Sequence, residues 1–296
     1  MSISRQSLSV LIVTFKSDKV IDRCIQSIPQ ELEIIIIDNS NNQFFKENIE
    51  RKYKNVKCYL SAENLGMGNG NNFGLKKINS DYALILNPDV TFEKNSFNEL
   101  ILASEKLKDF GIIAPKSSSQ KYPNYKLHEN KKKDVVDEIN PFKVKSVDGF
   151  AMLLNLKRLN KNFKEKGYFD ENIFMYLEND DLCKRLIEMK EDIFVAPKSI
   201  VHHEGGKAVD IKYSHEIELS RNWHWMWSKF YYNKKHYSFV KAFFNGMPSF
   251  ISAIIKFLIY FLLNKTKKKQ IYLHRILGFY NAISGKKSWF RPNVLN

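Results

Sequence analysis

The chain has 296 residues, of which 44% are hydrophobic and 27% charged, so it can bury a sizeable core and is neither a disordered nor a multi-span membrane protein. Lys and Arg outnumber Asp and Glu by 47 to 32, and this formal charge of +15 favours partners rich in phosphate, such as nucleic acid, nucleotides or anionic lipids. The three cysteines, Cys24, Cys58 and Cys183, show no CxxC spacing, which predicts reduced thiols in a cytosolic protein without a disulfide frame or zinc site.

The first half of the chain alternates apolar runs with helical patterns. The N-terminus has no small-residue cleavage signal, so its short apolar run predicts a first strand and not a signal peptide. Nearly unbroken apolar or β-branched runs predict strands at 8–15, 32–38, 56–60 and 82–87. Strands of this kind are buried on both faces, as in a parallel sheet covered by helices, so we expect an α/β fold.

Polar residues follow three of these strands. Asp38 closes the second run, a stretch rich in Gly and Asn follows the third, and Asp89 follows the apolar part of "ALILNPDV". Because ligands in such sheets bind outside the carboxyl ends of the strands, we expect these residues to gather along one rim. The later stretch 117–145 is polar, Lys-rich and weakly periodic, and we expect a variable excursion there.

The stretch "NLGMGNGNNFG" allows two interpretations. Its glycines would let backbone N–H groups approach a nucleotide, with asparagines to hydrogen-bond it, and we expect it to lead into a helix. The spacing matches neither the dinucleotide fingerprint nor the P-loop, so an ordinary structural loop remains open. The residues concerned are Gly66, Gly68, Gly70, Gly74, Asn64, Asn69, Asn71 and Asn72.

Three further groups are candidates for chemistry. Asp89 could hold Mg²⁺ or Mn²⁺ beside substrate phosphates, or it could cap the turn after Pro88. The acids of "YLENDDLCKR" could supply a general base, or they could cap a helix whose dipole favours acids in its first turn. His202 and His203 follow a strand-like run and could be structural or could bind a metal.

The order of several short motifs resembles family 2 glycosyltransferases, most closely the rhamnosyltransferase-like members that build bacterial surface polysaccharides. The resemblance covers about residues 7–232 and rests on "VTF", "IIIIDNS", "ENLGMGNGNNFG", "LNPDV", "DGFAML", "FDENIFMYLENDDLCKR" and "HHEGG". It implies a GT-A, Rossmann-like nucleotide-diphospho-sugar transferase fold with a mostly parallel sheet. It also implies an inverting, metal-dependent transfer of a sugar from a dTDP- or UDP-sugar to a hydroxyl of a glycan or polyprenyl-linked acceptor.

The resemblance also implies roles for individual residues. Asn87-Pro88-Asp89 would be the family's form of the DxD motif, with Asp89 as a ligand of Mg²⁺ or Mn²⁺ and His203 as the late metal ligand. The nucleoside would contact Thr14, Phe15 and Asp38. The ribose and diphosphate would be lined by Asn64, Gly66, Asn71 and Asn72. The donor sugar would lie above Asp148 and Gly149.

One position departs from the family pattern. Relatives carry Glu-Asp-x-Asp at this helix start, with the base in second place, but here that residue is Asn179, whose amide cannot accept a proton at neutral pH. We therefore expect Asp180 or Glu178 to act as the base, and Asp181 to have a structural or acceptor-side role. The alternative is a catalytically impaired scaffold or sensor that still binds sugar nucleotides.

The C-terminal third predicts helices that associate with a membrane. We expect a transferase domain over 1–214 and a helical region over 215–296, with an apolar helix at 248–263. That helix would be only about 24 Å long, too short for a hydrocarbon core of roughly 30 Å, so it suits the membrane interface or packs on the transferase domain. A lysine cluster at 265–269 would meet anionic headgroups, which predicts a cytoplasmic protein peripheral to the inner face of the cell membrane. Nucleic acid is not expected, because the acidic rim would repel a phosphate backbone.

Overall fold

The fold was examined in a computed structural model, which describes residues 7–107, 109–119, 121–128, 136–206 and 209–294. These residues form two compact units. The first contains the chain up to Phe169 together with Asn179–Val209, and the second contains Asp170–Glu178 with the chain from Asp210 onward. The chain therefore passes from one unit to the other three times.

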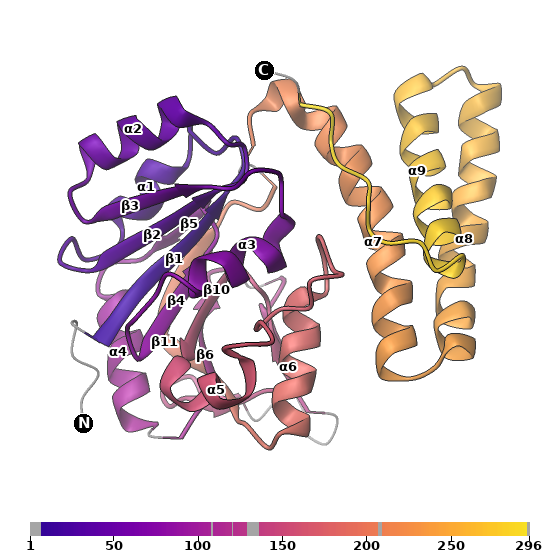
Figure 1. Cartoon of the computed structure of the whole chain (residues 1–296). Coiled ribbons are helices and arrows are strands. Elements are labelled where there is room, and N and C mark those ends of the chain that lie inside the picture. The colour runs from indigo at the N-terminus through magenta and orange to yellow at the C-terminus, as the bar shows by residue number, and fades with distance from the viewer. Residues whose placement is uncertain (1–6, 108, 120, 129–135, 207–208, 295–296) are drawn as a thin grey trace. The chain divides into compact units, whose positions relative to one another are not determined.

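The first unit is built on a central mixed sheet (Figure 1). Its parallel part has the order β3-β2-β1-β4 and consists of β1 (Leu8–Thr14), β2 (Glu33–Asp38), β3 (Val56–Leu60) and β4 (Tyr82–Leu86). The sheet continues through β10 (Ala151–Asn155), β6 (Ile112–Ser117), β11 (Ile193–His203) and β5 (Val90–Phe92), with β8 (Phe142–Lys143) paired to β11. In this part β10 and β5 run antiparallel to their neighbours, while β11 is parallel to β6. A separate two-stranded sheet joins β7 (Tyr125–Lys126) to β9 (Ser146–Val147).

Helices cover both faces of the large sheet, as the unbroken apolar runs predict. Successive strand residues point to opposite faces, so Ile34 and Ile36 join one hydrophobic core while Ile35 and Ile37 join the other. The first core is shared with α1 (Ile21–Gln26), α2 (Gln43–Lys52) and α4 (Ser96–Lys106). The second core is shared with α3 (Gly66–Leu75), α5 (Leu156–Phe163) and α6 (Glu178–Glu188).

The glycine-rich stretch differs from its predicted loop. It forms α3 itself, although glycine is a poor helix former, because its small residues let the helix lie close to the sheet. A Cβ atom at Gly74 would stand 2.2 Å from Leu11 Cδ1, and one at Gly70 would stand 2.8 Å from Val13 Cγ1. Glycine is therefore needed here for close packing of a helix on β1.

The second unit is helical and contains η3 (Ile211–Tyr213), α7 (Ser214–His236), α8 (Phe239–Leu262) and α9 (Thr266–Ile283) (Figure 1). Its core is aromatic and includes Trp223, Trp227, Phe230 and Phe279. Between its helices the backbones approach closely, since a Cβ at Gly278 of α9 would lie 2.2 Å from the Trp223 carbonyl oxygen of α7. Burial lowers the pKa of His224 in this core to about 3, and its ring nitrogens contact Ser288 Oγ and the Phe290 carbonyl.

Helix α8 is longer than the predicted apolar helix. It begins at Phe239, where Ser238 Oγ accepts a hydrogen bond from Lys241 N, and it includes Pro248. At 24 residues it is about 36 Å long, so the length argument made from the sequence is wrong. Among the described residues it is the one helix long and apolar enough to cross a membrane.

Candidate active site

The site begins at a tight turn after β4. Val90 N donates to the Asn87 carbonyl at 3.2 Å, and Asn87 N donates to the Phe150 carbonyl at 2.8 Å, which fixes both ends of the Asn87-Pro88-Asp89 linker. Pro88 has no N–H to extend a ladder, so β4 ends here and β5 starts at Val90. The Asp89 side chain is thereby held at 2% exposure beside the carboxyl end of the parallel strands.

His203 reaches this turn through strand pairing. The antiparallel register of β11 and β5 places Val90 opposite His203, and His203 Nε2 lies 3.4 Å from Asp89 Oδ1. The imidazole stacks on Phe150 with the ring centroids 4.3 Å apart, which fixes its orientation. His202 belongs to a different pair, with its Nε2 2.9 Å from Glu93 Oε1.

The residues around this turn fit a hard divalent cation. Asn87 Oδ1 and Asp89 Oδ1 are buried, and neither accepts a hydrogen bond from any described residue. Buried oxygens normally have donors, and one carboxylate with an imidazole and an amide oxygen leaves coordination positions for phosphates and water. Within the described ranges no three His, Cys, Asp or Glu side chains form a complete metal cluster. The turn therefore offers a carboxylate, an imidazole and an amide oxygen, with the remaining ligands to come from outside these side chains.

Asp38 lies at the end of β2 and organises its own loop. Its Oδ1 accepts hydrogen bonds from Thr14 Oγ1 at 3.2 Å and Ser40 Oγ at 2.6 Å, and its Oδ2 accepts from Asn42 N at 2.8 Å. The side chain is buried, so much of its acceptor capacity is used within the chain. Phe15 is the first residue after β1, and its N–H donates to Ser17 Oγ.

The start of α3 is tied to this loop. Asn39 Nδ2 donates to the Gly66 carbonyl at 3.0 Å, and Asn64 Oδ1 accepts from Gly66 N at 3.1 Å. Gly66 has a φ of 76°, the left-handed region that favours glycine. One turn further, Asn71 Oδ1 is buried and accepts no hydrogen bond among the described residues. This oxygen is a second place where a ligand could supply a donor.

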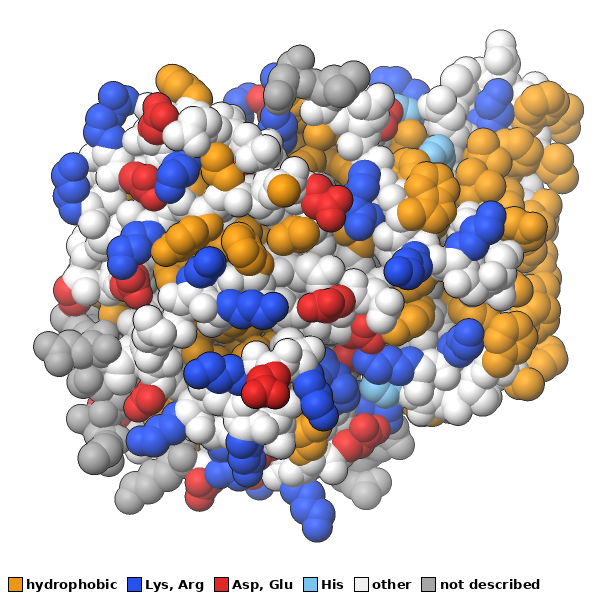
Figure 2. Space-filling model, viewed as in Figure 1, with side chains coloured by type: hydrophobic (Ala, Val, Ile, Leu, Met, Phe, Trp, Pro, Cys, Tyr) orange, Lys and Arg blue, Asp and Glu red, His pale blue; other side chains and the backbone are white. Residues whose placement is uncertain are grey.

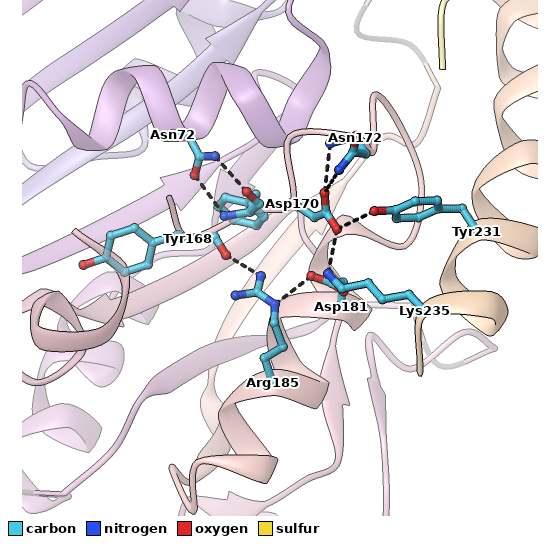
Figure 3. A network of polar contacts seen from close by, with 9 residues as sticks. Asn72, Tyr168, Asp170, Asn172, Asp181, Arg185, Tyr231 and Lys235 are labelled. Atoms are coloured by element: carbon cyan, nitrogen blue, oxygen red, sulfur yellow. Dashed lines mark hydrogen bonds and ion pairs between the residues drawn. The ribbon is translucent and has the colours of Figure 1, made fainter. Parts of the chain in front are cut away.

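Asn72 makes a two-point contact with a distant part of the chain. Its Oδ1 accepts from Phe169 N at 2.9 Å and its Nδ2 donates to the Phe169 carbonyl at 2.8 Å (Figure 3). The side chain is buried, and Gly167, with a φ of 82°, packs against its amide. Asn72 therefore positions the segment that ends at Phe169.

The acids at the start of α6 have separate surroundings. Asp181 is fully buried, and its Oδ2 lies 2.8 Å from Arg185 Nε, one turn along the helix. Arg185 in turn donates to the Tyr168 carbonyl at 2.5 Å (Figure 3). Asp180 is 15% exposed and pairs with Lys126 at 2.7 Å. Glu178 begins the helix but is grouped with the second unit.

Asn179 and the loop before β10 pack together. Asn179 Nδ2 donates to the Val147 carbonyl at 2.8 Å, and a Cβ at Gly149 would lie 3.2 Å from the Asn179 Cβ. Asp148 lies between Val147 and Gly149 in the sequence and keeps part of its surface exposed among these groups. Desolvation by nearby groups, followed by the charge of Asp180, raises the pKa of Asp148. The Asn179 amide thus lies next to two carboxylates that sequence reasoning placed in different roles.

Segment Asp170–Glu178 is held by the second unit. Asp170 Oδ2 lies 2.6 Å from Lys235 Nζ and accepts from Tyr231 Oη at 3.1 Å, while its Oδ1 accepts from Asn172 (Figure 3). Ser228 Oγ donates to the Met175 carbonyl at 2.7 Å. Burial raises the pKa of Asp170, but the hydrogen bonds from Lys235 and Asn172 outweigh it and leave the pKa lowered. This segment leads directly into α6.

Several residues near the candidates were missed from the sequence. Lys126 lies in the weakly periodic stretch expected to be a variable excursion, and no pattern there distinguishes it from its lysine neighbours. Asn39 directly follows Asp38 at a strand end, so its position could have suggested it. Phe150 could have been noticed only through its contact with His203.

Comparisons with known proteins agree with this fold. The chain resembles the crystal structure of GalNAc-T7 with UDP, GalNAc and Mn²⁺, at a TM-score of 0.56 and 16% identity over 74% of this chain and 51% of that one. The mannosyltransferase PcManGT from Pyrobaculum calidifontis, in complex with GDP-Man and Mn²⁺, matches 95% of this chain and 88% of its own at 12% identity, also with a TM-score of 0.56. This chain thus spans about half the length of the GalNAc-T7 structure. The predicted GT-A fold, a mixed, mostly parallel sheet followed by a helical region, is confirmed.

Two curated relatives match more than half of this chain in sequence. The low-salt glycan biosynthesis hexosyltransferase Agl10 of Haloferax volcanii is 24% identical over 220 residues, 69% of this chain and 68% of its own. The rhamnosyltransferase WbbL of Escherichia coli K12 is 26% identical over 204 residues, 60% of this chain and 75% of its own. The sequence model of the family described as Glycosyl transferase family 2 matches residues 9–178, more than half of the chain. With its sheet, its motifs and this match in agreement, the chain belongs to glycosyl transferase family 2.

Proposed function

We propose that this protein is a metal-dependent, inverting glycosyltransferase. It moves a sugar from a nucleoside diphosphate sugar to a hydroxyl of a lipid-linked or polysaccharide acceptor in cell-surface glycan synthesis. The observation that carries the proposal is the Asp89–His203 pair beside Asn87, where buried oxygens without hydrogen-bond donors lie at the strand ends. The names of the two relatives, a glycan biosynthesis hexosyltransferase and a rhamnosyltransferase, and the nucleotides and Mn²⁺ of both structural neighbours support it.

Asp89 and His203 would hold a Mg²⁺ or Mn²⁺ ion, with Asn87 turned toward it. Such an ion neutralises the negative charge that develops on a departing diphosphate. The chain's own contribution is to keep the carboxylate and the imidazole in place through the turn, the β5–β11 ladder and the Phe150 stack. Asn71 Oδ1, together with Thr14, Phe15, Asp38, Asn64 and Gly66, would line the rest of the donor.

Asp180 or Glu178 would take the proton from the acceptor hydroxyl. Asp180 is partly exposed and paired with Lys126, so its side chain can reach a ligand. Asp148 and Gly149 would lie below the sugar, and the neighbouring Asp148 and Asp180 carboxylates keep that surface acidic. Asp181 is buried against Arg185, so a structural role suits it best.

A second function competes with this one. Asn179 occupies the usual base position, and its amide is committed to the Val147 carbonyl. A protein that binds sugar nucleotides but does not turn them over, as a scaffold or sensor, would have this feature. Nucleotide binding without release of nucleoside diphosphate would favour it.

Rhamnose is the first sugar to test, because one relative bears the name rhamnosyltransferase. We further propose that the protein works on the cytoplasmic side of the cell membrane, since the apolar α8 and the lysines after it suit a lipid-linked acceptor. On this view the first unit is the transferase domain and the second attaches it to the membrane.

A donor screen tests the proposal. Purified protein is given dTDP-rhamnose and UDP- and GDP-sugars, with and without Mn²⁺, and release of nucleoside diphosphate is measured in the presence of polyprenyl-linked glycan acceptors. We expect Mn²⁺-dependent release with one donor class. Tight nucleotide binding with no release from any donor would support the scaffold instead.

A further inference from the structure

Helix α8 carries an apolar face that its own unit does not cover. Its buried residues, Ala242, Gly246 and Ala253, lie on one side. Six exposed apolar residues fall within a sector of about 60° on the opposite side, at 100° per residue. They are Val240, Phe244, Ile251, Ile255, Leu258 and Leu262. A soluble surface rarely keeps such a continuous apolar stripe unless a partner covers it, and Figure 2 shows apolar side chains gathered over this part of the molecule.

The charge of the chain is concentrated in the same region. After Glu218 the sequence contains 14 Lys and Arg residues and no Asp or Glu, so this stretch carries nearly all of the formal charge of +15. Lys265, Lys267, Lys268 and Lys269 follow the end of α8; the first three are exposed and Lys269 is half-buried. Charge asymmetry of this kind complements a negatively charged partner surface.

Aromatic rings connect the apolar face to the lysines. Lys269 Nζ lies 5.3 Å from the Phe261 ring centroid, and Lys268 Nζ lies 5.2 Å from that of Tyr260. Long basic side chains beside aromatic rings can keep their stems in an apolar layer and their ammonium groups in water. This arrangement matches the boundary between lipid headgroups and acyl chains.

The packing of α9 against α8 limits how α8 can bind a bilayer. The two helices pack side by side. The ring centroids of Phe250 and Phe279 are 4.9 Å apart, and those of the stacked Tyr260 and Tyr272 are 5.5 Å apart. On its other side α9 binds α7, through His215 to Gln270 and through Arg275 to Asn222.

If α8 crossed the hydrocarbon core, α9 would enter with it and bring Gln270, His274 and Arg275. Ionisable groups in that core are costly, so spanning would require the unit to come apart.

We infer that α8 and α9 form a hairpin that docks on the surface of a bilayer containing anionic lipids, with α8 in the plane of the interface and its exposed stripe toward the acyl chains. This deepens the proposed function, because a lipid-linked acceptor is reached at that surface. Its test measures lipid binding alone, so a negative result would not affect the outcome of the transfer assay.

The first experiment is flotation of the full chain with vesicles of neutral phosphatidylcholine or of phosphatidylcholine with phosphatidylglycerol. We expect binding to the anionic vesicles, weakened at least tenfold by Ile255→Glu with Leu258→Glu. Both residues are about half exposed, so the double variant should fold. Phe44→Glu, at a 74% exposed site on α2, is the matched control and should bind normally. Removing the helices would be a poorer test, because it would uncover Trp223 and Phe230.

Two results would overturn the inference. Unchanged flotation of the double variant would show that the stripe does not contact lipid. A full chain that is dimeric in solution and becomes monomeric in the double variant would show that a second copy covers the stripe.

The second experiment distinguishes in-plane from spanning binding. Lys267→Cys places a thiol just after the turn between α8 and α9, and the native Cys24, Cys58 and Cys183 are buried and should react slowly. Protein added outside vesicles is treated with a membrane-impermeant thiol reagent. In-plane binding predicts complete labelling, as in the absence of vesicles. Protection of the thiol would mean that the turn has crossed the bilayer, which contradicts the inference.

Discussion

At the scale of single residues, the candidate site depends on two neighbouring acid–histidine pairs with different surroundings. Asp89 with His203 is buried beside oxygens that lack donors, whereas Glu93 with His202 is exposed on the same ladder. Alternation along β11 separates the two imidazoles. Asp89 directly precedes β5 and Glu93 directly follows it, so the two pairs provide a test and its control at the two ends of one strand.

Asp89→Ala should abolish Mn²⁺-dependent donor binding and leave the fold intact, because the carboxylate lies at the end of the sheet and supports little core packing. Calorimetric titration with UDP or dTDP plus Mn²⁺ measures the affinity, and circular dichroism checks the fold. Glu93→Ala should bind as the wild type does. An unchanged affinity in Asp89→Ala would remove the metal role from this residue.

The base can be identified with three variants. If Asp180 or Glu178 accepts the proton, Asp180→Asn or Glu178→Gln should slow the chemical step by roughly 10² to 10⁴ with little change in donor affinity. Asn179→Asp should then raise the rate little, since its carboxylate would face the Val147 carbonyl. Single-turnover rates measure this step. A large gain in Asn179→Asp, with neither acid variant affected, would instead identify a transferase that has lost its base.

At the scale of helices and strands, the sequence predicts best where a segment's own pattern decides its structure. Strand β3 was predicted at its observed bounds, and β4 ends at Leu86, directly before the Asn87-Pro88 pair expected to stop it, because apolar runs and Pro88 act locally. A helix was expected after the glycine-rich stretch, but α3 begins within that stretch, because its glycines pack on Leu11 and Val13, which are remote in sequence. The start of α8 was missed because a proline usually marks the beginning or end of a helix, while here Ser238 caps the helix ten residues before Pro248. The 3.4 Å approach of His203 to Asp89 depends on strand register, which spacing alone could not give.

Close helix packing in the second unit should make Gly278 intolerant of substitution. In Gly278→Ala the added methyl group would overlap the Trp223 backbone, which cannot move aside as a side-chain tip can. We expect a loss of about 1–3 kcal/mol in the free energy of unfolding from overpacking. This outweighs the roughly 1 kcal/mol that alanine adds to a helix over glycine. Thermal denaturation measures it, and Leu277→Ala, an exposed change on the same helix, should cost less.

Asp170 should stabilise its segment in a pH-dependent way. Its pKa is lowered in the folded state, so its stabilisation is complete above the usual value of 3.8 and is lost as the pH falls through the lower folded value. Asp170→Asn should therefore cost about 1–3 kcal/mol at pH 7, and this difference should shrink below pH 3.8. Denaturant unfolding at several pH values measures it. Asp22→Asn, in an exposed pair with Lys52, should cost under about 1 kcal/mol throughout.

At the scale of the whole molecule, the two units differ in charge and share one segment. Residues up to Glu218 hold 33 Lys and Arg against 32 Asp and Glu, so nearly all of the formal charge of +15 lies after Glu218, within the second unit. Asp170–Glu178 leaves the first unit, binds Ser228, Tyr231 and Lys235, and returns as α6. The second unit therefore supports the segment that precedes the candidate base.

A chain that ends at Val209 should separate donor binding from transfer. It keeps both cores of the first unit and the Asp89–His203 pair, so we expect donor affinity within about threefold of the full chain. It lacks the partners of Asp170, so we expect transfer to fall at least as far as loss of general-base catalysis, roughly 10²-fold or more. Calorimetry and nucleoside diphosphate release measure the two. Full transfer by the shortened chain would show that the helical unit does not support the reaction.

The pairing of β11 with β5 also bears on how the protein is made. His203 lies 114 residues after Asp89, and β11 is the last strand of the sheet in the sequence. Chains emerge from the ribosome N-terminus first, so the Rossmann-like first half can begin to collapse while the second proposed ligand is still being synthesised. A nascent chain would thus lack a complete site for an activated sugar until its sheet closes, and nucleotide added during synthesis could stabilise only molecules translated past this strand.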